Sequence, residues 1–154
     1  MKINTVGFVG TGVMGKSMIR HLLKKYNVVV YNRTKERALD LLEEGAIWAD
    51  TPTEVANQSD VVLTIVGYPK DVEEVYFGEQ GIFKSTKEHL VVVDLTTSTP
   101  TLAKRIAEEA TSRSWEALDA PVSGGDLGAK NGTLSTMVGG TEETLEKVYP
   151  VLDC

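Results

Sequence analysis

The strongest constraint on the fold is a glycine-rich turn near the start of the chain. An apolar, β-rich run over residues 5–9 leads directly into Gly10, Gly12 and Gly15, which have the spacing GxGxxG. Apolar residues then recur every four positions as far as Leu22, as on one face of a helix. This order of strand, glycines and helix is typical of a dinucleotide-binding turn, in which backbone approaches a pyrophosphate closely. The alternative is an ordinary strand-to-helix turn that uses glycine for a positive φ.

Strand and helix patterns alternate along most of the chain. Runs of β-branched residues at 28–31, 61–66 and 90–94 are continuous rather than alternating, as expected for parallel strands buried on both faces. Further strands are expected at 46–48, 115–118 and 135–138, and helices at 35–44, from 51, at 71–77, from 99 and from 141. The helix from 51 should begin with a capping box, in which the Thr51 hydroxyl and the Glu54 carboxylate each accept the backbone N–H of the other residue. Repeated βαβ units with right-handed crossovers predict an α/β fold. The expected form is a Rossmann-like, doubly wound, mostly parallel sheet with a late added strand.

Composition limits the classes of function. The chain has 154 residues, the length of one domain, and a formal net charge of -6, which argues against nonspecific binding to nucleic acid or anionic membranes. Its one cysteine, Cys154, cannot form an internal disulfide, which fits a reducing compartment. Neither a signal-peptide pattern nor an apolar run of transmembrane length is found. We therefore expect a soluble, cytoplasmic protein, with no nucleic-acid or membrane partner and no metal site.

The residues after the second expected strand indicate which dinucleotide is bound. An acidic residue about 20 positions past the glycines would bind the ribose 2′-hydroxyl of NAD and repel a 2′-phosphate. This chain instead has Asn32, Arg33 and Thr34, an amide, a guanidinium and a hydroxyl that together could hold a phosphate. The sequence therefore predicts NADP(H) rather than NAD(H). The alternative is that Arg33 is only a solvated charge at the start of a helix.

Two later loops also follow expected strands, and ligands of such sheets bind beyond the carboxyl ends of the strands. Val66 and Gly67 begin a loop that could lie flat against a nucleotide, although an ordinary turn has the same composition. In the loop after the next strand, Thr99 is the expected helix N-cap, which leaves Thr97 for a ligand or for a simple turn.

The most specific stretch is Asp119-Ala120-Pro121-Val122-Ser123-Gly124-Gly125. Successive glycine N–H groups beside a serine hydroxyl form a concave site suited to a carboxylate. Together with residues 7–15, Asn32-Arg33-Thr34 and Asp94-Leu95-Thr96-Thr97, this stretch resembles the β-hydroxyacid dehydrogenase family. That family includes 3-hydroxyisobutyrate dehydrogenase, tartronate semialdehyde reductase, glyoxylate reductase and 6-phosphogluconate dehydrogenase.

The resemblance implies a role for each motif. Ser123, Gly124 and Gly125 would bind the substrate carboxylate, while Thr97, Val66 and Gly67 would lie along the cofactor towards the nicotinamide. The full set of expected cofactor-binding residues is Gly10, Thr11, Gly12, Val13, Met14, Gly15, Asn32, Arg33, Thr34, Val66, Gly67 and Thr97. The chain departs from the family at Val66-Gly67-Tyr68, where relatives usually have Leu-Pro-Asn.

In this family the proton at the substrate hydroxyl is handled by a lysine on a helix that would lie beyond residue 154. By resemblance, residues 1–154 are therefore one dinucleotide-binding domain without a catalytic residue, which binds cofactor but does not turn over substrate. The parent protein would add a helical catalytic domain that also builds a homo-oligomer. That parent would be an NADP-dependent oxidoreductase that moves hydride between the nicotinamide and a small 3-hydroxy acid.

Two other functions remain open at this point. The chain could be a stand-alone dinucleotide-binding module without catalysis. It could also belong to a reductase of imines, since such enzymes share the cofactor domain. The stretch 119–125 argues against the imine reductase, because it supplies a carboxylate site that an imine would not use.

Overall fold

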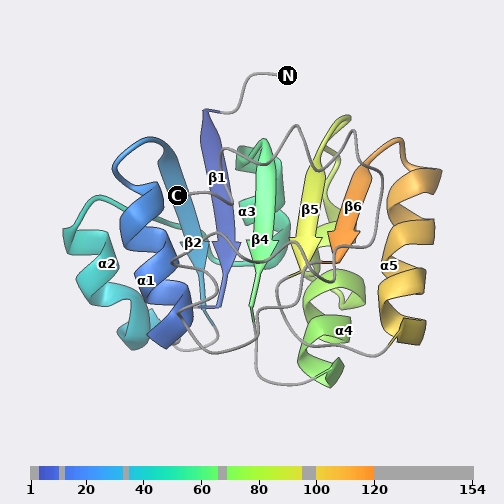
Figure 1. Ribbon diagram of the computed structural model, residues 1–154, viewed down its shortest axis with the longest axis horizontal. Helices are drawn as coiled ribbons and strands as arrows, with labels where there is room; N and C mark the ends of the chain where they lie inside the picture. The colour runs from blue at the N-terminus through green and yellow to red at the C-terminus, as the bar shows by residue number, and fades with distance from the viewer. Residues whose placement is uncertain (1–3, 11–12, 33–34, 66–68, 95–99, 120–154) are drawn as a thin grey trace.

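A computed structural model of the chain describes residues 4–10, 13–32, 35–65, 69–94 and 100–119. They form a three-layer α/β fold in which all six strands run in the same direction (Figure 1). The strands are β1 (Thr5–Val9), β2 (Asn27–Tyr31), β3 (Ile47–Trp48), β4 (Val61–Thr64), β5 (Val91–Asp94) and β6 (Glu116–Asp119). The predicted late strand at 135–138 lies outside the described residues.

The order of strands in the sheet is β3-β2-β1-β4-β5-β6. This is the order of a doubly wound dinucleotide-binding sheet, in which the chain moves outward from β1 first to one side and then to the other. The point of reversal lies between β1 and β4, because β1 pairs with both β2 and β4. The predicted Rossmann-like fold is confirmed, since the buried β-branched runs form the central parallel strands.

Helices cover both faces of the sheet, as the side chains of each strand point alternately to opposite sides. On one face, Phe8, Val30 and Leu63 pack against helices α1 (Val13–Leu22) and α2 (Leu39–Glu43). On the other face, Val9, Val29 and Val62 belong to the core formed with α3 (Pro52–Gln58), α4 (Pro69–Phe77) and α5 (Pro100–Ser112). The sheet is therefore buried on both sides, which explains why its strands are continuous apolar runs.

Local signals locate most helix ends correctly. The Thr51 hydroxyl accepts the N–H of Glu54 at 3.1 Å, so the predicted N-cap is present with Pro52 at the first helical position. The Glu54 carboxylate, however, accepts the N–H of Asp50 at 3.0 Å rather than that of Thr51. The helix expected at 35–44 is divided, because Lys35–Ala38 is a 3-10 turn and only Leu39–Glu43 is α-helical.

Candidate functional site

The last residues of five strands lie side by side at one edge of the sheet. Tyr31 pairs with Val9, Val9 with Thr64, Thr64 with Asp94, and Asp94 with Asp119. Every loop that the sequence singled out leaves the sheet from this row, which is the arrowhead end of the strands in Figure 1. Ligands of doubly wound sheets bind at this edge, near the point where the strand order reverses. The candidate site is therefore the region beyond this row of residues.

The glycine turn leaves the row at Gly10. Gly10 has a φ of 104°, a value that side chains disfavour, and its N–H donates to the carbonyl oxygen of Tyr31 at 2.9 Å. Helix α1 then begins at Val13, so Met14 and Gly15 lie in its first turn. That turn contains no acidic residue, and its N–H groups have no partner within the helix. A helix N-terminus of this kind favours a negatively charged group such as a phosphate.

A group of ion pairs joins helices α1 and α2 beside this turn, and the sequence analysis did not identify it. Lys16 Nζ and Arg20 Nη2 each lie 3.1 Å from Asp40 Oδ2, and Arg20 Nε lies 3.0 Å from Glu44 Oε2. The hydrogen bond from Lys16 lowers the pKa of the Asp40 carboxyl below its usual value. The hydrogen bond to Glu44 raises the pKa of the Arg20 guanidinium. These pairs hold α2 against α1, next to the loop that follows β2.

The ends of β4 and β5 share a buried group of hydroxyl and carboxyl side chains. Thr64 Oγ1 donates to Asp94 Oδ1 at 3.1 Å and lies 2.9 Å from the Tyr76 hydroxyl oxygen. All three residues are buried, although the surrounding core is apolar. Sequence reasoning missed this group because its members are 12 and 30 residues apart and belong to three elements. A tyrosine on the inner face of the short helix at 71–77 was the one available signal.

Only part of the predicted cofactor site belongs to the described residues. Gly10, Val13, Met14 and Gly15 are placed together at the turn into α1, and Asn32 follows β2 directly at the same edge. The predicted site residues that lie outside the described ones are Thr11, Gly12, Arg33, Thr34, Val66, Gly67, Thr97, Ser123, Gly124 and Gly125. Asp94 and Asp119, which precede two of these loops, end neighbouring strands. The predicted cofactor and substrate segments therefore start from adjacent strands.

No group of three or more histidine, cysteine, aspartate or glutamate side chains among the described residues is arranged to hold a metal ion. None of the helices formed by these residues is long and apolar enough to cross a membrane.

The chain matches one protein family over nearly its whole length. Residues 5–154 match the model of a family described as the NAD binding domain of 6-phosphogluconate dehydrogenase. The chain is 55% identical over 148 residues to the "Uncharacterized oxidoreductase YkwC" of Bacillus subtilis, covering 96% of this chain and 51% of the relative. It is 51% identical over 148 residues to "Probable 3-hydroxyisobutyrate dehydrogenase-like 1, mitochondrial" of Arabidopsis thaliana, covering 95% of this chain and 44% of the relative.

Solved structures give the same result for the fold. The structure titled "Psf3 in complex with NADP+ and 2-OPP" superimposes with a TM-score of 0.84 at 30% sequence identity, covering 96% of this chain and 53% of the other. The chain thus spans about half the length of the curated relatives it matches.

Proposed function

Because this chain belongs to the family of the NAD binding domain of 6-phosphogluconate dehydrogenase, we propose that it holds the nicotinamide dinucleotide of an oxidoreductase that prefers NADP(H). The proposal rests above all on the turn at Gly10. A glycine with a φ of 104° follows the central strand β1 and precedes a helix whose first turn has no acidic residue. This geometry fits a pyrophosphate, which needs close backbone approach and free N–H groups.

The preference for NADP(H) depends on the residues that follow β2. Asn32 occupies the position at the end of β2 where a carboxylate would bind the 2′-hydroxyl of NAD, so nothing there repels a 2′-phosphate. We assign Arg33 and Thr34 to that phosphate, because a guanidinium binds phosphate oxygens in pairs. The related solved structure whose title names NADP+ is consistent with this assignment.

The reaction of the whole protein is part of the same proposal. A relative at 51% identity is named a 3-hydroxyisobutyrate dehydrogenase-like protein, so we propose a small 3-hydroxy acid as the substrate. The cofactor would supply or accept hydride at its nicotinamide, and we assign Val66, Gly67 and Thr97 to that ring. Ser123, Gly124 and Gly125 bind the substrate carboxylate.

The proposal for the whole protein includes a second, helical domain. Proton transfer belongs to a lysine on a helical domain beyond Cys154, which also builds the homo-oligomer. The 154-residue chain by itself binds cofactor without turnover. We place the protein in the cytoplasm.

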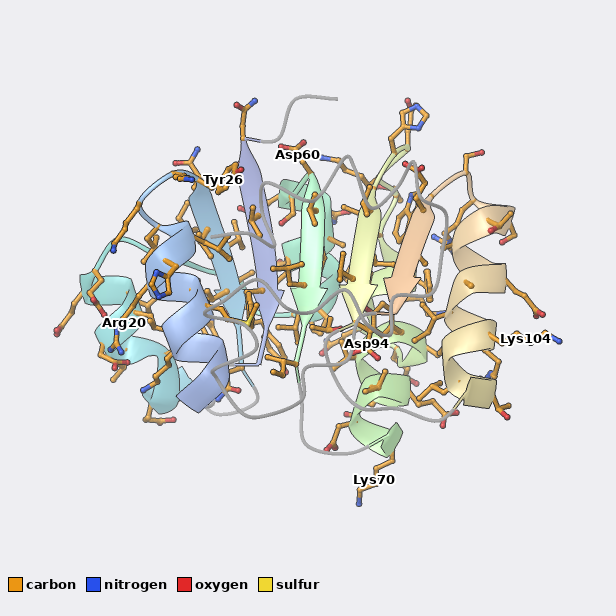
Figure 2. The ribbon with its side chains drawn as sticks, viewed as in Figure 1. Arg20, Tyr26, Asp60, Lys70, Asp94 and Lys104 are labelled. Carbon is orange, nitrogen blue, oxygen red and sulfur yellow. The ribbon has the colours of Figure 1, made fainter. Side chains whose placement is uncertain are left out.

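The test is calorimetric titration of the chain with NADPH and, separately, with NADH. We expect tighter binding of NADPH, and a loss of that preference in Arg33→Asp, because the new carboxylate repels the 2′-phosphate. Lys104→Asp is the matched control, since it makes the same change of charge on α5, at the opposite end of the molecule from α2 (Figure 2). It should retain the preference for NADPH.

Other outcomes would correct different parts of the proposal. Tighter binding of NADH by the unchanged chain would disprove the role of residues 32–34 but not the dinucleotide site. If the folded chain bound neither cofactor, the function proposed for the Gly10 turn would be wrong.

A further inference from the structure

The buried hydroxyl and carboxyl side chains at the ends of β4 and β5 have no role in the function proposed so far. Thr64 and Tyr76 are fully buried and Asp94 is 3% exposed, so these groups are withdrawn from water. Figure 2 shows Asp94 at the arrowhead end of β5, at the edge of the sheet assigned to the cofactor. We call Tyr76, Thr64 and Asp94 the buried polar chain.

The number of hydrogens on each hydroxyl group determines which residue donates each hydrogen bond in the buried polar chain. A threonine hydroxyl has one hydrogen, and Thr64 donates it to Asp94 Oδ1 at 3.1 Å; the carbonyl oxygen of Val93, at 3.5 Å, is a weaker acceptor. Thr64 Oγ1 can then only accept from the Tyr76 hydroxyl, which lies 2.9 Å away. Tyr76 therefore donates to Thr64, and Thr64 donates to Asp94. Each bond fixes the orientation of the next group.

The three residues come from the three elements that border the loops at this edge. Thr64 is the last residue of β4, Asp94 is the last residue of β5, and Tyr76 lies on α4, the helix that follows the loop after β4. The buried polar chain thus fixes β4, β5 and α4 relative to one another at the level where two loops leave the sheet. The proposed function assigns Val66 and Gly67 of one loop, and Thr97 of the other, to the nicotinamide half of the cofactor.

Packing alone does not require these polar groups. The ring of Tyr76 lies 5.6 Å from the ring of Phe83, and a phenylalanine would retain that contact. A valine would fill the space of Thr64 inside a core that is otherwise apolar. Burying hydroxyl and carboxyl groups costs free energy unless they bond to one another, while bonded networks favour one arrangement of the elements they join.

We propose that the buried polar chain of Tyr76, Thr64 and Asp94 is a positioning network for the nicotinamide half of the dinucleotide. This inference rests on the proposed function, because it requires that the protein binds a dinucleotide at the edge of the sheet where β4 and β5 end. The three residues act through the elements they join and do not touch the cofactor.

The experiment compares the binding of two ligands to the 154-residue protein by calorimetric titration. NADP+ is the complete cofactor, whereas adenosine 2′,5′-bisphosphate has the adenosine and the 2′-phosphate but not the nicotinamide half. We expect Tyr76→Phe, which removes one hydrogen bond of the network, to weaken NADP+ binding about threefold to tenfold. Thr64→Val removes two hydrogen bonds and should weaken NADP+ binding at least as much. Binding of adenosine 2′,5′-bisphosphate should remain unchanged, and Thr64→Ser should restore NADP+ binding.

Ser59→Ala is the matched control. Ser59 is another fully buried hydroxyl, bonded to the carbonyl oxygen of Val55 at 2.6 Å, but it precedes β4 at the opposite edge of the sheet. Its removal should change the binding of neither ligand. If Thr64→Val does not fold, Tyr76→Phe and Thr64→Ser still decide the result, since Tyr76→Phe retains the ring and Thr64→Ser retains the hydroxyl and removes only one methyl group.

Two results would overturn the inference, and they differ from each other. If the unchanged chain binds both ligands and the variants weaken both equally or neither, the network has no positioning role although the proposed function stands. If the unchanged, folded chain binds neither ligand, the proposed function fails and the inference fails with it.

Discussion

The backbone N–H of Gly10 donates to the carbonyl oxygen of Tyr31 at 2.9 Å, so the pairing of β1 with β2 continues one residue beyond the strands themselves. Gly10 makes this bond with a φ of 104°, which a residue with a Cβ rarely adopts. The turn into α1 is therefore joined to the sheet by a bond that depends on glycine. This relationship links the fold to the proposed pyrophosphate site.

Gly10→Ala should weaken both folding and cofactor binding. The strained backbone should lower the free energy of unfolding by about 1–3 kcal/mol, as measured by urea denaturation. Calorimetric titration should show weaker NADPH binding, because the turn that presents the N–H groups of α1 would shift. Gly45→Ala is the matched control: Gly45 has a φ of 115° with open space around it, far along the chain after α2. It should lose similar stability and retain full NADPH affinity.

Gly7→Ala should destabilise the protein by overpacking the contact between β1 and α3. A Cβ on Gly7 would meet Ser59 Oγ and would lie 2.5 Å from Val55 Cγ1. Ser59 cannot turn away without losing its bond to the carbonyl oxygen of Val55. Overpacking of this kind costs about 1–3 kcal/mol, measurable as a lower midpoint of urea denaturation. Gly7→Ala combined with Ser59→Ala should cost less than the sum of the two single changes; additive costs would contradict the proposed clash.

Thr51→Ala should remove the N-cap of α3. Thr51 has extended backbone angles and its hydroxyl satisfies the N–H of Glu54, which has no acceptor within the helix. We expect the free energy of unfolding to fall by about 1 kcal/mol. Thr51→Ser retains the hydroxyl and should recover most of that loss. An equal loss in both variants would mean that the methyl group of Thr51, rather than its hydrogen bond, stabilises the helix.

Most of the fold could be predicted from the sequence because its signals are local. The runs at 28–31 and 61–66 are apolar on both faces, which in a chain of this length indicates parallel strands between two layers of helices. The start of α3 follows from Thr51 and Pro52 alone. The 3-10 turn at Lys35–Ala38 was not predicted, since the apolar spacing of 35–44 suits a continuous helix. The predicted partner of Glu54 was also wrong, because a carboxylate there can reach more than one N–H.

The candidate site was predicted less completely, because it depends on contacts between distant parts of the chain. Gly10 could be identified because the GxGxxG spacing stands between a β-rich run and a helical pattern, which are adjacent in the sequence. The buried polar chain could not, because nothing near Thr64 in the sequence indicates that Asp94 and Tyr76 will meet it. The pairing of α1 with α2 through Asp40 was missed for the same reason: its partners are 20 and 24 residues away.

Asp40→Asn should make the protein less stable at neutral pH and remove part of its response to acid. The Asp40 carboxylate accepts from Lys16 and Arg20, and the hydrogen bond from Lys16 lowers its pKa from the ordinary value of 3.8. A carboxyl whose pKa is lower in the folded state stabilises that state at pH values above the unfolded value. This stability is lost as the pH falls from about 4 through the lowered pKa, because the proton then binds the unfolded chain more strongly. The difference in urea midpoint between the two proteins should be full at pH 7 and should narrow below pH 4.

Salt and a second variant separate this ion pair from general effects of charge. The Asp40 carboxylate and the Lys16 and Arg20 cations are all partly exposed, so salt screens their attraction. Added salt should therefore reduce the difference in urea midpoint between Asp40→Asn and the unchanged chain at pH 7. Glu43→Gln removes a charge from the same helix, and Glu43 makes no ion pair with any residue that the structure describes. Its stability should follow that of the unchanged chain at every pH. If Glu43→Gln behaved as Asp40→Asn does, the effect would come from net charge and not from the contact between α1 and α2.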